Sequence, residues 1–165
     1  MAPDLDQSFI NPEMLDILFN NVPVGIAVFD RDLVLKKVNP TWASYIARYT
    51  QTPIEKVVPG VHFTEIVPGT EGTSVARYQR ALAGEIVSGE SVPLESGGIV
   101  SYWDTYMAPL VVDGEIIGVV DVTSDATECQ STLTKWSEAA AQLKAIVQAF
   151  PDLYFRLSPD GIILD

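Results

Sequence analysis

The chain has 165 residues, enough for one ordinary domain and some additional structure. Hydrophobic residues make up 47% of it, so a buried core can form, whereas its formal net charge of −12 argues against binding to nucleic acid or contact with a membrane surface. The single cysteine, Cys129, excludes an internal disulfide and a cysteine-based zinc cluster. We expect a cytoplasmic location, because the N-terminus lacks the apolar core of a secretory signal and no apolar run is long enough to span a membrane.

Helix and strand signals alternate along the first part of the chain. An asparagine followed by proline, Asn11, is typical of a helix start, and apolar residues recur at helical spacing after it. Two apolar runs, residues 24–30 and 33–38, flank a polar pair and predict a hairpin. Asn39, again followed by proline, predicts a second helix with aromatic residues along one side.

Short helical pieces and three more strands are predicted next. Prolines and glycines interrupt residues 51–70, so we expect turns and loops there, followed by a helix over residues 71–84. Apolar segments at 86–94, 99–110 and 115–123 are separated by Gly-Gly and Asp-Gly turns, which predicts an antiparallel meander. The element order indicates an α+β domain: a five-stranded antiparallel sheet with short helices on one face, flanked by an N-terminal helix and a C-terminal linker helix.

The predicted linker helix carries a possible dimer seam. Its apolar residues are spaced alternately three and four apart, the pattern of a two-stranded coiled coil, over about two and a half heptads. A helix that packs this stripe on its own domain would have the same pattern, and the two interpretations are equally supported. The seam residues are Leu133, Trp136, Ala140, Leu143, Val147 and Phe150.

Four segments together resemble the PAS family over about residues 11–128. They are VPVGIAVFDRDLVLKKVNPTW, RYQRALAGE, YWDTYMAPL and DGEIIGVVDVTSDATE. Asn39 matches the asparagine at the head of the family's first core helix. The last segment is similar to the strand ending in Asp-x-Thr that closes PAS domains, and it supplies Asp125 and Thr127 here. The resemblance implies that these two residues form a junction that couples the sheet to the helix that follows.

The end of the chain repeats the form of its opening hairpin. The segment FPDLYFRLSPDGIILD has the same succession of apolar strand, polar turn and apolar strand as VPVGIAVFDRDLVLKKV. It resembles the first hairpin of a second, truncated PAS domain. The expected organisation is therefore an N-terminal tail at 1–10, a PAS domain at 11–128, a helical linker at 129–150 and the truncated second domain at 151–165.

The resemblance also implies an internal pocket between the sheet and the helices. Strand alternation, matched to the family, turns Trp103, Thr105 and Met107 inward on one strand and Asp121 and Thr123 inward on the last. A register error of one residue would turn the other side chains inward instead. Aromatic residues in such a pocket can wrap a fatty acid or an aromatic metabolite, although they more often fill a core. The pocket candidates are Trp42, Tyr45, Phe63, Arg77, Tyr78, Trp103, Thr105, Met107, Asp121 and Thr123.

Two charged residues among the pocket candidates, Arg77 and Asp121, could bind polar groups of a ligand. Either Arg77 or Arg80 can reach inward and hold a carboxylate, although a solvent-facing arginine is the more common arrangement. Asp121, if it points inward, needs a partner, because an unpaired buried carboxylate is costly. Arg77 or a donor group of a ligand would serve. The alternative is that the last strand is bulged at Asp121 or that Asp121 lies at an exposed edge.

Haem and covalent flavin are not expected. Haem-binding PAS domains generally carry an axial histidine on their long helix, whereas the single histidine, His62, precedes that helix. Light-sensing flavin relatives carry a cysteine in an Asn-Cys-Arg motif in mid-domain, whereas Cys129 lies beyond the last strand. A small organic ligand or non-covalent flavin stays open, and the identity of any cofactor is unknown.

No enzymatic activity is expected, since the chain has no phosphate loop, no Gly-x-Ser-x-Gly and no His-Glu-x-x-His. We expect a sensory input domain of a multidomain signalling protein that binds a small molecule, forms a homodimer through its N-terminal or linker helix, or does both. In relatives the output domain is often a histidine kinase or a cyclic-dinucleotide enzyme. The alternatives are a ligand-free module that serves only dimerisation, and a haem or flavin sensor of redox state or gas.

Overall fold

The computed structural model describes residues 11–149, 156–157 and 163–164, and it divides into two compact units, Met1–Thr127 and Glu128–Asp165. The elements of the first unit are α1 (Pro12–Asn21), β1 (Gly25–Asp30), β2 (Leu35–Val38), α2 (Pro40–Tyr49), the 3-10 turn η1 (Ile54–Lys56), α3 (Phe63–Ile66), α4 (Ser74–Leu82), β3 (Val87–Ser96), β4 (Ile99–Val112) and β5 (Glu115–Asp125). Among the described residues, no helix has the length and apolar composition that a membrane crossing requires.

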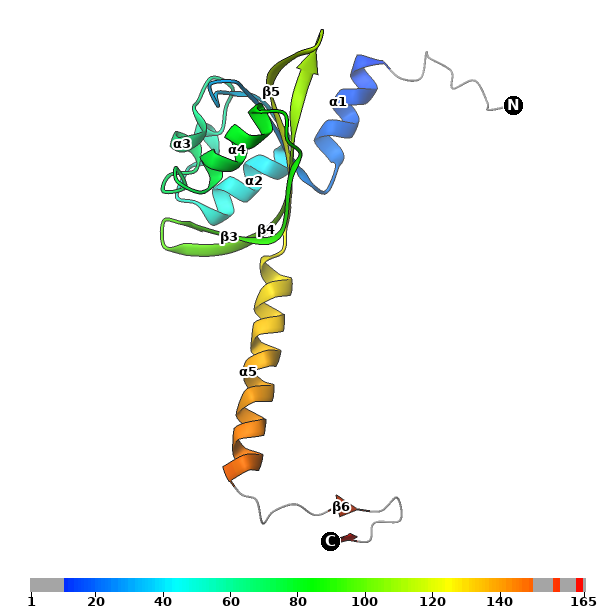
Figure 1. Cartoon of the computed structure of the whole chain (residues 1–165). Coiled ribbons are helices and arrows are strands. Elements are labelled where there is room, and N and C mark those ends of the chain that lie inside the picture. The colour runs from blue at the N-terminus through cyan, green and yellow to red at the C-terminus, as the bar shows by residue number, and fades with distance from the viewer. Residues whose placement is uncertain (1–10, 150–155, 158–162, 165) are drawn as a thin grey trace, which may run out of the picture. The chain divides into compact units, whose positions relative to one another are not determined.

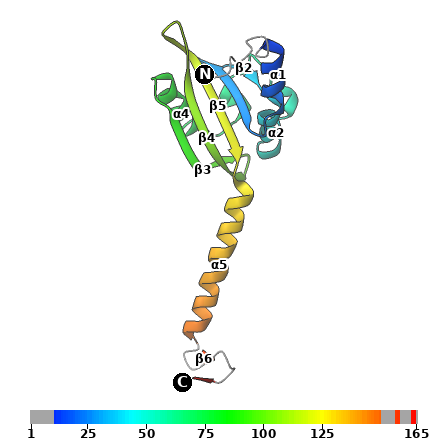
Figure 2. The ribbon, with the colours of Figure 1, turned by 90° about the vertical axis from the view of Figure 1, so that its right-hand side faces the viewer.

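The first unit is a five-stranded sheet in the order β2-β1-β5-β4-β3, with every neighbouring pair antiparallel. Figure 1 shows α2, α3 and α4 together on one face of this sheet. Helix α1 lies on the other side (Figures 1 and 2), where its Asp16 forms an ion pair of 2.6 Å with Lys37 of β2. The predicted α+β class, with a five-stranded antiparallel sheet and helices on one face, is confirmed.

Two-residue turns make the β3–β5 meander longer than predicted. The turns Gly97-Gly98 and Asp113-Gly114 have positive φ at both residues, from 51° to 83°. This is the type I′ geometry whose twist matches the strands it joins, so the ladder continues to the turn on both sides. Strands β3 and β4 therefore end two residues later than predicted, at Ser96 and Val112. Strand β5 also ends two residues later, at Asp125.

The start of α4 also differs from the prediction. The helix expected over residues 71–84 begins only at Ser74. The carbonyl of Thr70 accepts hydrogen bonds from the N–H groups of Thr73 and Ser74, and this closes a separate turn before the helix.

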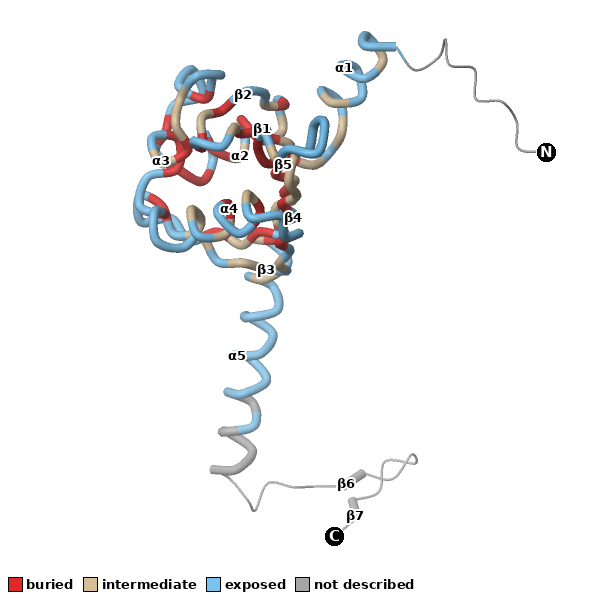
Figure 3. The backbone as a smooth tube through the Cα atoms, turned by 45° about the horizontal axis from the view of Figure 1, so that its top comes forward, coloured by how far each residue is buried: buried red, intermediate tan, exposed pale blue. Residues whose placement is uncertain are grey.

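An aromatic cluster forms the centre of the core between the sheet and the helices. Phe29 of β1 is fully buried, and its ring makes edge-on contacts with Trp42, Phe63 and Tyr78 at centroid distances of 5.9, 5.7 and 5.2 Å. Figure 3 shows buried positions on β1, β4 and β5 and on the helices that cover them. This packing holds α2, α3 and α4 against one face of the sheet.

Asn39 joins α1, β1 and α2 through its side chain, which has no exposed surface. Its Oδ1 accepts hydrogen bonds from the backbone N–H groups of Trp42, as the N-cap of α2, and of Ile26 in β1, both at 2.9 Å. Its Nδ2 donates to the carbonyl oxygens of Phe19 and Val24 at 3.1 and 2.9 Å. One asparagine therefore pairs four backbone groups from three segments.

The second unit contains the linker helix and a short ladder. Helix α5 spans Thr127–Ala149, and β6 (Arg156–Leu157) pairs antiparallel with β7 (Ile163–Leu164). This pairing lies within the segment expected to begin a second domain, the rest of which lies outside the described residues. Whether the segment begins a second domain stays a prediction.

The predicted seam on α5 is described only in part. Leu133 and Trp136 are 57% and 73% exposed, and Ala140 is also exposed. Leu143 and Val147 belong to α5, but their side chains lie outside the described part, as does Phe150 entirely.

Replacing Asn39 by alanine tests the importance of this asparagine for the fold. We expect the Asn39→Ala variant to lose about 3 kcal/mol or more of unfolding free energy, because buried backbone groups are left without partners. Asn11→Ala is the matched control: Asn11 also caps a helix before a proline, but it is exposed and pairs one N–H group, that of Met14. Its loss should be about 1 kcal/mol. Equal losses in urea denaturation would contradict this role of Asn39.

Candidate functional site: a cavity between the sheet and the helices

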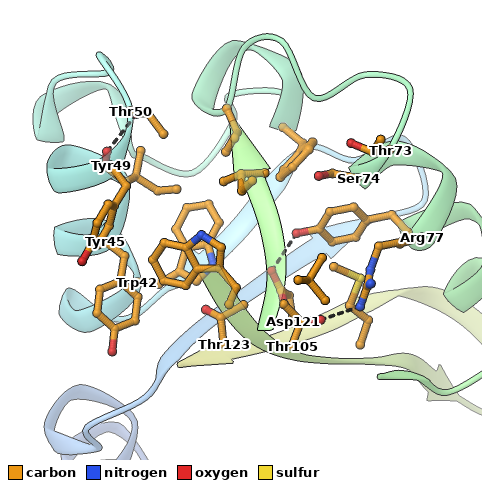
Figure 4. Close-up of a pocket in the computed structure, with 18 of the residues that line it drawn as sticks. Trp42, Tyr45, Tyr49, Thr50, Thr73, Ser74, Arg77, Thr105, Asp121 and Thr123 are labelled. Carbon is orange, nitrogen blue, oxygen red and sulfur yellow. Dashed lines mark hydrogen bonds between the residues drawn. The ribbon is translucent and has the colours of Figure 1, made fainter. Parts of the chain in front are cut away.

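A cavity of about 100 Å³ lies between the sheet and helices α2, α3 and α4. Figure 4 shows side chains from both layers around it. Every pocket candidate named from the sequence lines it: Trp42, Tyr45, Phe63, Arg77, Tyr78, Trp103, Thr105, Met107, Asp121 and Thr123.

The inward direction of the strand residues follows from the register of the sheet. Thr105 of β4 pairs with Thr123 of β5, and Met107 pairs with Asp121, so both strands present these side chains to the same face. On the other face Tyr106 is 44% exposed. Val119, which the same alternation turns inward, is fully buried but does not line the cavity.

Some lining residues were not predicted: Ile46, Tyr49, Thr50, Val67, Thr73, Ser74, Val92, Pro93 and Leu94. The apolar stripe of α2, with its helical spacing, was a usable signal for Ile46 and Tyr49. Strand β3 gave no such signal. Its register slips between Gly89 and Val92, so residues three apart, rather than two apart, face inward there.

Arg77 of α4 extends towards the cavity across the inner face of the sheet. Its Nη2 donates a hydrogen bond to Oγ1 of Thr105, and its guanidinium lies close to Gly89 of β3, where a Cβ atom would be only 3.1 Å from both terminal nitrogens. Its Nε is buried and has no hydrogen-bond partner. Arg80 is exposed and instead bonds Glu85 at 2.6 Å.

Asp121 places a carboxylate in the interior of the domain, where it is only 3% exposed. The hydroxyl of Tyr78 donates to its Oδ2 at 2.7 Å, whereas its Oδ1 has no hydrogen-bond partner. Strand β5 is the central strand, and Asp121 pairs in regular register with Ala27 and Met107. The alternatives of a bulge or an exposed edge at Asp121 are therefore wrong. The partner in this structure is Tyr78.

The pKa values of the buried Asp121 and Tyr78 side chains are both shifted from their ordinary values. Burial raises the pKa of Asp121 to about 6; the Tyr78 hydroxyl, the Trp42 indole and the Arg77 charge act in the opposite direction but offset only part of the effect. The pKa of Tyr78 is raised well above its usual value by burial and by the neighbouring carboxylate. Asp121 can therefore change its charge close to neutral pH while Tyr78 remains a donor.

Tyr49 connects the cavity wall to the end of the sheet. Its ring packs edge-on against Trp103 at a centroid distance of 5.2 Å, and its hydroxyl donates a hydrogen bond to Oδ2 of Asp125. Oδ1 of Asp125 accepts from the N–H of Thr127 at 2.9 Å. Oγ1 of Thr127 in turn accepts from the N–H of Tyr102 at 3.0 Å. The two junction residues predicted from the sequence are thus bonded to each other, to the sheet and to the cavity wall.

The pKa of the Asp125 carboxyl reflects these bonds. Partial burial raises it, but the hydrogen bonds from Tyr49 and Thr127 lower it by more, so the net pKa lies below the usual value. Asp125 is therefore ionised at neutral pH and acts as an acceptor for both donors.

The residues considered for cofactor binding lie elsewhere. His62 caps α3, where its Nδ1 accepts from the N–H of Thr64 at 3.2 Å, and it does not line the cavity. Cys129 is exposed on α5. Within the described part of the chain, no three His, Cys, Asp or Glu side chains are grouped as a metal site would require.

Comparison with known proteins identifies the fold. A family model described as the PAS fold matches residues 19–130. The PAS domain of a Colwellia psychrerythraea protein matches with a TM-score of 0.56 at 14% identity, over 70% of this chain and 97% of that one. A sensory box histidine kinase/response regulator from Burkholderia thailandensis matches with 0.55 at 10% identity, over 79% and 98%.

A third similar structure is the PAS domain of nitrogen regulation protein NR(II) from Vibrio parahaemolyticus. Its TM-score is 0.51 at 10% identity, over 68% of this chain and 97% of that chain. No curated protein matches significantly. At such low identities these structures establish likeness of fold.

The buried Asp121 should make stability depend on pH. Its pKa of about 6 in the folded state exceeds the ordinary 3.8, so its contribution is fully present below about pH 4 and is lost as the pH rises through about 6. The difference corresponds to about 3 kcal/mol. The lowered pKa of Asp125 acts in the opposite direction, with a contribution that is lost only as the pH falls below about 4.

The Asp121→Asn variant isolates the contribution of Asp121 to the pH dependence of stability. Its amide oxygen can still accept the hydrogen bond from Tyr78, but the amide side chain does not titrate. We expect the unfolding free energy of the wild type, relative to that of the variant, to fall as the pH rises from about 4 to 7. Urea denaturation at several pH values measures it. Parallel pH profiles of the two proteins would rule out a raised pKa at Asp121.

Proposed function

Since the chain belongs to the PAS family, we propose that it is a sensory input module that binds a small molecule in its cavity and relays occupancy through α5 to an output domain. PAS domains are sensory modules of signalling proteins rather than catalytic domains. Both the ligand and the output are part of the proposal.

The observation that carries the proposal is that two residues lining the cavity each have a buried polar atom without a partner. Asp121 and Arg77 line the same cavity, and Oδ1 of Asp121 and Nε of Arg77 are buried with no hydrogen-bond partner in the protein. Buried polar atoms in folded proteins are almost always hydrogen-bonded, and an unpaired one is costly. A ligand that pairs with both would remove this cost, whereas a module that only assembles its parent needs no such atoms.

The size and the walls of the cavity favour a small ligand. Pockets for drug-sized ligands usually measure about 300–1,000 Å³, and this cavity measures about 100 Å³. Its walls are mainly aromatic and aliphatic, so burial of the ligand's apolar surface would contribute affinity, and the few polar groups would select its chemistry.

The relay is proposed to run through Tyr49. A ligand that moves the aromatic wall formed by Trp103 and Tyr49 would shift the Tyr49 hydroxyl relative to Asp125. Asp125 bonds Thr127, the first residue of α5. Occupancy of the cavity would thereby alter the start of the linker helix through one continuous set of contacts.

Exposed apolar residues support a homodimer and with it the second candidate function, a module that serves only assembly. Leu15, Ile17 and Leu18 of α1 are each about half exposed, at 54%, 56% and 49%. Leu133 and Trp136 of α5 are exposed as well. Apolar side chains gathered on a helix are a common basis of protein association, so we propose that α1 or α5 forms the contact between copies.

Native mass spectrometry of the purified chain distinguishes these functions, because it weighs the assembly and any retained ligand together. We expect a dimer that carries a defined additional mass. A dimer of bare chains would favour the assembly function over ligand sensing. A bare monomer would contradict both the dimer and the retained ligand.

The Tyr49→Phe variant tests the relay, since it removes the hydroxyl that bonds Asp125 and keeps the ring. We expect hydrogen exchange at the amides of Tyr102 and Thr127 to rise roughly fivefold, the effect of losing about 1 kcal/mol of local stability. Tyr45→Phe is the matched control: Tyr45 lies on the same helix and packs on the same Trp103 at 5.1 Å, but its hydroxyl bonds only Pro23. Equal exchange in both variants would contradict the relay.

A further inference from the structure

We propose that the cavity is selective for a small organic acid that also carries a hydrogen-bond donor, with Arg77 holding the carboxylate and Asp121 accepting from the donor. This inference rests on the proposed function, because it specifies the ligand of the same cavity. It follows from the hydrogen-bond partners, the burial and the charge of Arg77 and Asp121.

Arg77 provides the site for an anion. Its guanidinium is held in place by the bond to Thr105 and by the close approach to Gly89, so a ligand does not have to order it. It takes part in no ion pair with any carboxylate of the described residues. Its buried Nε–H has no acceptor. A cationic residue that lines an apolar cavity and has a donor without a partner favours a carboxylate over a neutral carbonyl group.

Asp121 provides the site for a donor. Tyr78 donates to its Oδ2, and although the Trp42 indole lies near enough to lower the pKa of the carboxyl, no donor reaches Oδ1 within hydrogen-bonding geometry, so Oδ1 can accept from a ligand. A carboxylic acid with no hydroxyl or ammonium group could be held by Arg77 but would leave Oδ1 of Asp121 unpaired. The acid therefore has to carry a hydroxyl or an ammonium group in addition to its carboxylate.

The two polar residues belong to different elements of the cavity wall. Arg77 projects from α4 and its guanidinium bonds Thr105 of β4, whereas Asp121 lies on the central strand β5; Figure 4 shows the bonds from Tyr78 to Asp121 and from Arg77 to Thr105. The ligand's acceptor and donor must therefore be separate groups of one short molecule. The cavity of about 100 Å³ is well below the usual volume of about 300–1,000 Å³ for a drug-sized ligand, which favours a small acid.

Isothermal titration calorimetry on the whole chain, after dialysis, tests this selectivity with three probes of similar size. L-Lactate offers a hydroxyl donor, L-alanine offers an ammonium donor, and propionate offers none. We expect lactate or alanine to bind at least about tenfold more tightly than propionate, the usual effect of leaving a buried acceptor unpaired. The stronger of the two identifies the donor. Equal binding of all three would overturn the role of Asp121.

Variants of Arg77 test whether this residue holds the carboxylate of the ligand. Arg77→Met should reduce the affinity for the preferred acid at least about tenfold, whereas Arg80→Met, on the exposed side of the same helix, should leave it unchanged. Arg77→Lys keeps the charge but lacks the planar donor group, so it should also weaken binding even if the methionine variant does not fold. Unchanged affinity in Arg77→Lys and Arg77→Met would overturn the role of Arg77.

The Asp121→Asn variant separates the donor contact from the acid contact. The amide oxygen remains with Tyr78 and the amide N–H₂ group turns towards the cavity, so the preference for alanine over propionate should disappear, because an ammonium group cannot accept from N–H₂. If no acid binds while native mass spectrometry finds another retained molecule, the inference fails and the proposed function stands. If no acid binds and no molecule is retained, both this inference and the proposed function fail.

Discussion

The burial of a carboxylate in the middle of the sheet is the constraint on which the rest of the cavity depends. Asp121 lies on the inner face of the central strand β5, under the covering helices, and is only 3% exposed, so its carboxylate needs a partner within the domain. Tyr78 must therefore project from α4 to donate to it, and this fixes the helix over the strand. Arg77, one residue earlier, is thereby brought to the same cavity.

The aromatic packing that lines the cavity also reaches the end of the last strand. Trp103 packs between Tyr45 and Tyr49, and Tyr49 is hydrogen-bonded to Asp125 at the end of the last strand. A close-packed interior transmits small displacements, because it has few voids that can absorb them. The domain thus has a short physical connection from its interior to the first turn of α5.

The sequence predicted features that depend on local pattern. Asn39 before a proline marked a helix start, and the alternation of β4 and β5 placed Thr105 and Thr123 on the inner face. Features that depend on tertiary contacts were not predictable. The slip of β3 between Gly89 and Val92 reverses its alternation; a glycine inside a strand is typical of a bulge, but it does not by itself tell which residues face inward after it. Nor does spacing along the chain indicate that the Tyr49 hydroxyl meets Asp125, which is 76 residues away.

A crystal structure of the chain, purified without refolding, tests the central claim most directly, because it shows the contents of the cavity at the two unpaired atoms. The account predicts electron density for a small molecule with an acceptor within hydrogen-bonding distance of Arg77 Nε and a donor at Asp121 Oδ1. A cavity closed by direct contact between these two side chains, with no molecule between them, would contradict it.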